Sequence, residues 1–308
     1  MFNPTEIIFS ATTACNLHCA HCFVNRDTKK ISSEDAINFL KSAVEADSNI
    51  KKIGFSGGEP FLYFDFILTL TKSALEMDLM FDQIMTNGDW WNNQSDLTGT
   101  LQQLYDAGYD GKIGLSWDKF HGQTSERMHT FIRTVQNIFG EDSINIQRVA
   151  GGESLPLATN SSPSATEFSA TPSNGEFPVT PPDIPTYILP QSFPSSDSRA
   201  WQAKKWFKDD FCEGPGQILY IHADGNIAPC CGFANENKEL FIGNIKQDYV
   251  TVMKQALENK MVNICYENGL GKYKKVLKKQ LKQKGQKFPG KCNDICSFCD
   301  FVCHNLKV

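Results

Sequence analysis

Residues 6–22, with the sequence EIIFSATTACNLHCAHC, place an apolar run directly before three closely spaced cysteines. The run from Glu6 to Thr12 is rich in β-branched and aromatic residues, which predicts a buried strand. Cys15, Cys19 and Cys22 follow it with C-x3-C-x2-C spacing. The stretch therefore predicts a strand that delivers a cysteine-rich loop at its carboxyl end.

Strand-like and helical segments alternate along the residues that follow. Strands separated by helices of this length predict an α/β fold with a parallel sheet or an open β/α barrel. In such folds the reactive groups gather at the carboxyl ends of the strands. The predicted strands are Lys52–Ser56, Phe81–Thr86, Lys112–Ser116 and Ile144–Val149. One helix is predicted to begin after Ser32 and Ser33, and three more are predicted over Phe64–Met77, Leu97–Ala107 and Ser125–Phe139.

The alternation stops at residue 151. Residues 151–198 hold nine of the fourteen prolines and many serines and threonines. Such a composition buries too little apolar surface to order itself, so an insertion is expected over about residues 151–185. A sixth strand is expected at Thr186–Pro190. We therefore expect a first domain over residues 1–205 and a smaller second domain over residues 206–308.

Eleven cysteines in a chain of 308 residues need an explanation. The count is odd, and the N-terminus has no basic segment followed by an apolar run, so secretion and disulfide pairing are not expected. Clustered cysteines in a reducing cytoplasm are typical metal ligands. No apolar stretch is long enough to span a bilayer. The sequence thus predicts a cytoplasmic protein with no membrane partner.

Nine lysines and no acidic residue lie between Gly271 and Lys291. Such a stretch could attract an acidic peptide or nucleic acid. However, Tyr273, Val276, Leu277 and Leu281 recur at helical spacing, which favours a solvated surface helix in which only these four residues face inward. No nucleic-acid-binding motif accompanies the lysines, so no nucleic-acid partner is expected.

The cysteine triplet at residues 15–22 predicts a metal centre. Three thiolates can each hold one corner iron of a [4Fe–4S] cluster and leave the fourth iron without a protein ligand. An open position is what a catalytic metal site requires. A zinc site with His18 or His21 as the fourth ligand is the alternative that this motif leaves open.

The segment Gly57-Gly58-Glu59-Pro60 follows the second predicted strand. Together with the cysteine triplet, it makes residues 5–200 resemble the radical S-adenosylmethionine (SAM) superfamily. The resemblance implies a partial (β/α)6 barrel with SAM bound at the open iron. It also implies reductive cleavage of SAM to a 5′-deoxyadenosyl radical, with an electron donor such as flavodoxin or ferredoxin.

The same resemblance implies which residues contact SAM. Glu59 and its loop would receive the amino group, where two glycines let the backbone approach a ligand closely. His21 would lie along the adenine, and Arg148 could pair with the carboxylate or be structural. The full set of implied SAM-binding residues is His21, Gly57, Gly58, Glu59, Asn87, Ser116, Asp118 and Arg148.

The C-terminal third carries the other eight cysteines. Asp224-Gly225 lies between two apolar runs and predicts a hairpin that brings Cys230 back toward Cys212. With the C-x2-C pair Cys296 and Cys299, these thiolates would fill a closed auxiliary [4Fe–4S] cluster. The region resembles the twitch and SPASM extensions of radical SAM enzymes. The full SPASM C-x2-C-x5-C-x3-C run is missing, so Cys292 and Cys303 could be spare thiols or other ligands, and a structural zinc site stays open.

Three features resemble epipeptide-type peptide epimerases: the segment Ser116 to His121, Pro229-Cys230-Cys231, and a terminal Ile-Cys-x2-Cys. This resemblance implies inversion of a Cα centre in a ribosomally made peptide substrate. A thioether or C–C crosslink, a side-chain oxidation, and a non-catalytic electron-transfer or sensing protein are the alternatives.

Cys231 is the expected catalytic residue of an epimerase. Neighbouring side chains in an extended segment point to opposite faces, so Cys231 should point away from a cluster that Cys230 binds. It would then donate a hydrogen atom to the peptide. The alternative is a small buried cysteine without a chemical role.

Overall fold

The computed structural model describes residues 2–19, 21–149, 184–208 and 218–306. The insertion expected over about residues 151–185 lies almost entirely outside these ranges, and so does Cys212.

Six parallel strands form the first part of the sheet, in the order β6-β5-β4-β3-β2-β1. Each strand pairs with its neighbour in the chain, as expected for strands joined by helices. This confirms the α/β fold with a parallel sheet. The strands are β1 (Glu6–Ser10), β2 (Lys52–Ser56), β3 (Met80–Thr86), β4 (Lys112–Ser116), β5 (Ile144–Val149) and β6 (Thr186–Leu189).

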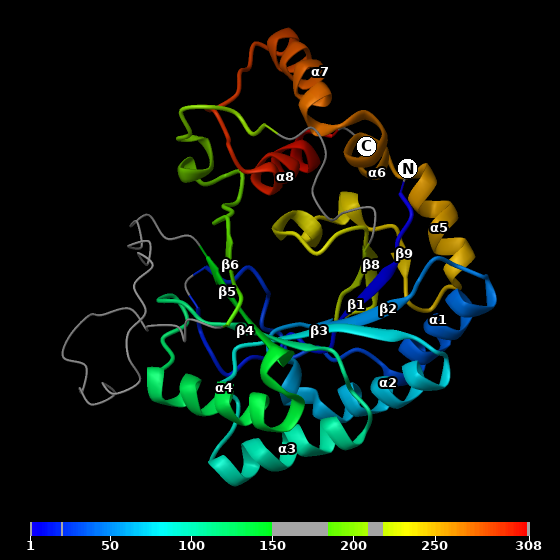
Figure 1. The fold of residues 1–308 in the computed structure, drawn as a ribbon. Helices are drawn as coiled ribbons and strands as arrows, with labels where there is room; N and C mark the ends of the chain where they lie inside the picture. Colours follow the sequence, from blue (N-terminus) through cyan, green and yellow to red (C-terminus); the bar gives the residue numbers. More distant parts are fainter. Residues whose placement is uncertain (1, 20, 150–183, 209–217, 307–308) are drawn as a thin grey trace, which may run out of the picture.

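Four helices lie together on one side of this sheet (Figure 1). Their apolar residues recur at helical spacing; in the first helix Ala36, Phe39, Leu40 and Ala43 are buried. Ser32 caps that helix, as expected, because its hydroxyl accepts a hydrogen bond from the Asp35 amide. The helices are α1 (Ser33–Glu45), α2 (Phe64–Glu76), α3 (Gln94–Asp106) and α4 (Ser125–Phe139).

The C-terminal part of the chain continues the same sheet. Strand β7 (Ile218–Ile221) pairs in parallel with β1, and β8 (Asn226–Ala228) and β9 (Gly243–Asn244) follow in antiparallel order. The hairpin predicted at Asp224-Gly225 joins β7 to β8, with Gly225 at a φ of 85°. Strand β1, which carries the cysteine loop, is therefore interior to the sheet.

The buried apolar residues form two hydrophobic cores, and each core contains residues from both sides of the domain boundary expected at residue 205. The first core includes β7, β8 and α5 (Tyr249–Glu258) together with the parallel strands. The second core packs Ala200 and Trp201 against the last helices. These are α6 (Lys260–Val262), a π-helical segment (Asn263–Asn268), α7 (Leu270–Gln283) and α8 (Ile295–Asn305).

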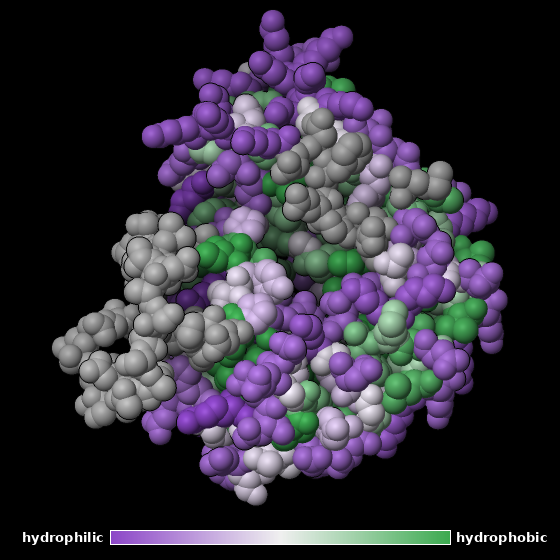
Figure 2. All heavy atoms as spheres, in the orientation of Figure 1, coloured by the Kyte–Doolittle hydropathy of each residue, from purple (hydrophilic) through white to green (hydrophobic). Residues whose placement is uncertain are grey.

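The lysine-rich stretch forms α7, whose surroundings at the top of the molecule are hydrophilic (Figure 2). Leu277 and Leu281 are buried, but Val276 is 48% exposed, so the expectation that Val276 faces inward was wrong. Lysines occupy the remaining faces, which agrees with a solvated helix. Among the described residues, no helix has the length and apolarity needed to cross a membrane.

The turn after β2 approaches the start of the cysteine loop closely. The amides of Gly58 and Glu59 donate to the carbonyls of Thr12 and Ala14, both at 2.7 Å. A Cβ on Gly58 would lie 2.3 Å from the Ala14 oxygen, and Gly57 has a φ of 142°. The glycines are thus required by contact with the chain's own backbone, which is a different reason from the ligand approach expected from the sequence.

Gly58→Ala should therefore lower the free energy of unfolding by about 1–3 kcal/mol, because backbone atoms must move to admit the methyl group. Gly99→Ala is the matched control. Gly99 lies inside α3, where an added Cβ would meet no atom of the described residues within 4 Å, and alanine there should stabilise the helix by up to about 1 kcal/mol. Urea unfolding measures both changes. Equal stability of the two variants would contradict this account of the turn.

Candidate functional site

One cavity of about 500 Å³ opens at the carboxyl ends of the parallel strands. Its size is in the range of small-molecule sites in proteins. Cys15, Cys19 and Cys22 all line it. So do seven of the eight residues implied to contact SAM, namely His21, Gly57, Gly58, Asn87, Ser116, Asp118 and Arg148.

The three thiols of the cysteine loop fit a cationic metal centre. Burial raises the pKa of Cys15, and burial together with the neighbouring thiols raises that of Cys19 to about 11. Three thiols held this close oppose each other's ionisation, and a bound metal removes that opposition. The loop would hold three irons of a cluster through Cys15, Cys19 and Cys22.

Glu59 is the residue that joins the strand ends behind the cavity wall. Its carboxylate accepts hydrogen bonds from the Thr86 hydroxyl and the Asn87 amide, both at 2.8 Å, and from the Phe61 amide at 3.1 Å. The side chain is fully buried, and burial raises its pKa to about 7. Glu59 does not line the cavity, so its geometry is that of a positioning residue, and direct contact with SAM stays a prediction.

Asn87 connects this network to the cysteine loop. Its side-chain amide donates to the Asn16 side chain at 2.9 Å and lies 3.7 Å from the Cys15 sulfur. On the other side, Gln123 donates to the carbonyl oxygens of Asn87 and Ser116. Gln123 thus holds the ends of β3 and β4 together. The sequence offered no signal for it, because it lies on the connection after β4 and belongs to no motif.

Asp118 organises another part of the cavity wall. One carboxylate oxygen accepts from the Val149 amide at 3.0 Å, and the other accepts from the Phe120 amide at 2.9 Å and contacts His121 Nδ1 at 2.7 Å. The rings of His21 and His121 lie 4.9 Å apart. Ligand atoms of Asp118 and these two histidines lie within 4.8 Å of one another, so they could also hold a cation.

Burial in this wall favours a neutral His21. Burial and the nearby His121 lower the pKa of His21. A neutral, flat ring at the cavity edge is compatible with the adenine contact implied for it. Arg148 lies 5.7 Å from the ring of Trp117 and lines the same cavity, where it remains a candidate for pairing with a carboxylate.

Cys231 lines the cavity together with two acidic residues, Glu6 and Asp82. Lys52 lies 3.3 Å from the Glu6 carboxylate and hydrogen-bonds to Asp82. Burial and the Asp82 charge raise the pKa of Glu6 to about 7. Cys231 is exposed, unlike the small buried cysteine that the sequence left as the alternative. Partial desolvation in the cavity, followed by the Glu6 charge, raises the pKa of its thiol to about 11.

Cys230 belongs to a different site. With Cys296 and Cys299 it lines a small cavity in the second core, and their role as cluster ligands stays a prediction. Cys265, to which the sequence assigned no role, lines it too. Cys212 lies outside the described residues. The two neighbouring cysteines after β8 thus line two different cavities.

Comparison with protein families matches two parts of the chain. Residues 9–138 match the radical SAM superfamily, and residues 212–300 match SPASM, an iron–sulfur cluster-binding domain. The chain therefore contains a radical SAM domain followed by a SPASM domain. Its cofactors are SAM, the [4Fe–4S] cluster of the first domain and an auxiliary iron–sulfur cluster.

Individual relatives divide into partial and full-length matches. The chain is 28% and 29% identical to GTP 3′,8-cyclases of Aliarcobacter butzleri and Chlorobaculum tepidum, but spans only 36% and 42% of their length. These two matches cover 39% and 49% of this chain. YydG of Bacillus subtilis (strain 168), named for peptide biosynthesis, is 23% identical over 97% of this chain and 92% of its own.

Among solved structures, anSMEcpe with bound AdoMet and the Cp18Cys peptide has the same fold. Its TM-score is 0.57 at 14% identity, with 99% of this chain and all of the other covered.

Glu59→Ala should leave three buried donors without an acceptor. Each such loss costs about 1–3 kcal/mol, so the variant should be less stable, and its displaced glycine turn should bind SAM about tenfold more weakly. The cysteine loop keeps its three thiols, so the iron content should not change. Equilibrium dialysis with SAM, iron analysis and thermal unfolding measure these effects.

Glu76→Ala removes an exposed carboxylate from the end of α2 and serves as the control. Unchanged SAM affinity in the Glu59 variant would remove Glu59 from the site.

Proposed function

We propose that this enzyme modifies a ribosomally made peptide and inverts the configuration of one Cα centre. The observation that carries the proposal is that Cys231 lines the same cavity as Cys15, Cys19 and Cys22. An epimerase needs a hydrogen-atom donor at the site where hydrogen is removed. The similarity to YydG along 97% of the chain supports a peptide substrate.

With the cluster and SAM bound, the cavity would supply a 5′-deoxyadenosyl radical that takes the hydrogen from one face of Cα. The hydrogen that completes the inversion comes from a residue of this chain. Cys231 donates a hydrogen atom to the opposite face: the S–H bond breaks, a C–H bond forms, and a thiyl remains on Cys231. One electron from a protein donor of the flavodoxin or ferredoxin type and one solvent proton restore the thiol.

The walls of the cavity restrict this removal and return of hydrogen to one position of the substrate. Glu59, Asn87 and Gln123 hold the strand ends at fixed positions, which limits the poses open to the substrate. Apolar residues such as Ile8, Phe55 and Leu189 line the cavity beside the polar groups and reduce the access of water to a reactive site.

The test uses the peptides encoded by short reading frames next to the gene, incubated with reduced enzyme and SAM in D2O. The Cys231 proton exchanges with solvent, so the product should gain one deuterium at one Cα and contain one D-residue. Cys231→Ala should still cleave SAM but give no D-residue. Chiral amino-acid analysis and mass spectrometry measure both.

Cys292→Ala is the matched control, because the buried Cys292 thiol donates to the Asp294 carbonyl and does not line the cavity. A product that has lost two hydrogens would show crosslinking or oxidation in place of epimerisation. Wild-type yield of D-residue from Cys231→Ala would contradict the donor role.

A further inference from the structure

Helix α7 carries positive charges that have no counter-charge in the described part of the chain. Five exposed lysines of this helix form no ion pair there, and they are Lys272, Lys275, Lys278, Lys279 and Lys282. Together they are called the lysine face. We propose that the lysine face binds the acidic electron-donor protein that reduces this enzyme. The proposal is independent of the epimerisation proposed above, because it concerns only the supply of electrons for the cleavage of SAM.

Helical spacing gathers these lysines on one side of α7. Lys275, Lys279 and Lys282 recur at the i, i+4 and i+7 positions. The buried residues Leu277 and Leu281 lie on the other side and anchor the helix in the second core. The surroundings of α7 at the top of the molecule are hydrophilic in Figure 2. The lysine face is therefore turned toward solvent, where a partner can reach it.

The charges of the lysine face repel one another in the isolated protein. Like charges four residues apart destabilise a helix, and Lys275 and Lys279 are such a pair. Lys278 and Lys282 are a second pair. The first turn of α7 contains no acidic residue, and Gly269 supplies no side-chain cap, so nothing there offsets the positive end of the helix dipole. An acidic partner would relieve this repulsion, which favours its binding.

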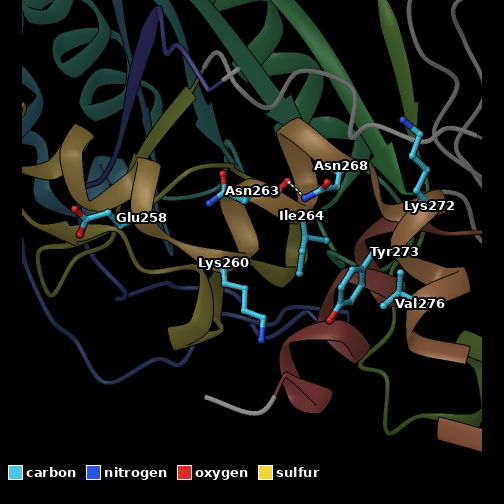
Figure 3. Close-up of a pocket in the computed structure, with 8 residues that line it drawn as sticks. All are labelled: Glu258, Lys260, Asn263, Ile264, Asn268, Lys272, Tyr273 and Val276. Atoms are coloured by element: carbon cyan, nitrogen blue, oxygen red, sulfur yellow. Dashed lines mark hydrogen bonds between the residues drawn. The ribbon is translucent and has the colours of Figure 1, made fainter. Parts of the chain in front are cut away.

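An outer groove beside the lysine face adds contact area (Figure 3). Lys272 of the lysine face lines the groove together with Tyr273 and Val276 of the same helix. Val276 is 48% exposed, although it is apolar. Lys260 lines the groove too, and Glu258 is the acidic residue among those that line it. The groove thus combines apolar area with positive charge at its edge, as interfaces reached by electrostatic steering do.

The position of α7 favours an electron donor over the peptide substrate. The helix lies within residues 212–300, which match the SPASM iron–sulfur domain. Its first residue, Leu270, lines the small cavity of the second core together with Cys230 and Cys296. Among the described residues that line the cavity at the strand ends, none belongs to α7. A protein bound at the lysine face would therefore contact the iron–sulfur domain without having to reach the substrate.

The test uses the full reconstituted enzyme and a reduced flavodoxin with an acidic surface. Flavodoxin is oxidised by one electron as an iron–sulfur centre of the enzyme is reduced. Changing Lys275, Lys278 and Lys282 together to glutamine removes three positive charges from the lysine face. Flavodoxin affinity and its rate of reducing the enzyme should each fall about tenfold, which is within the range of electrostatic steering. Binding calorimetry and stopped-flow absorbance measure these effects.

Two controls separate docking from other effects. Dithionite is a small reductant that needs no docking surface, so it should reduce the α7 variant at the wild-type rate. Changing Lys41, Lys246 and Lys254 together to glutamine alters the net charge equally, because these exposed lysines lie on α1, a turn and α5. This control variant should bind flavodoxin like the wild type. Both variants should unfold like the wild type, since the altered side chains are exposed.

Three results would overturn the proposal. The first is wild-type affinity for flavodoxin in the α7 variant. The second is equal weakening in the α7 and control variants, because net charge and not the lysine face would then determine binding. The third is weaker binding of the peptides encoded next to the gene with unchanged flavodoxin binding, which would assign the lysine face to the substrate.

Discussion

The roles proposed for the two sites depend on one constraint: two neighbouring cysteines directly after β8 line different cavities. Cys230 lines the small cavity of the second core, together with Cys296 and Cys299. Cys231 lines the cavity at the strand ends. Because β7 pairs with β1, the hairpin that carries these cysteines is part of the same sheet as the SAM-binding loop. The proposed hydrogen donor and the proposed cluster ligand are therefore adjacent residues that line different cavities.

The same sheet also positions the loops that surround the cavity at the strand ends. Loops after successive strands are tied together by buried polar contacts, with Glu59 joining the turn after β2 to the end of β3 and Gln123 joining β3 to β4. Backbone contact between the glycine turn and residues 12–14 sets where the cysteine loop starts. The cavity is therefore defined by rigid strand ends, which suits a reaction that must protect a radical from other hydrogen donors.

Much of this could be predicted from the sequence. Hydrophobic periodicity located the strands, and the resemblance to the radical SAM superfamily implied that Asn87, Ser116 and Asp118 belong to one site at the strand ends. The alternation of side chains predicted that Cys230 and Cys231 point apart. Contacts between distant segments could not be predicted in this way. Cys265 lies in a π-helical turn with no motif around it, and the partners of Gly58 and Glu59 appear only when β1, β2 and β3 are packed.

The most direct test compares the iron content of Cys230→Ala and Cys231→Ala after identical anaerobic reconstitution. If the two thiols serve different cavities, the Cys230 variant should bind about four irons per chain and the Cys231 variant about eight, as in the wild type. Equal loss of iron from both variants, or loss from the Cys231 variant alone, would contradict the division of roles on which this account depends.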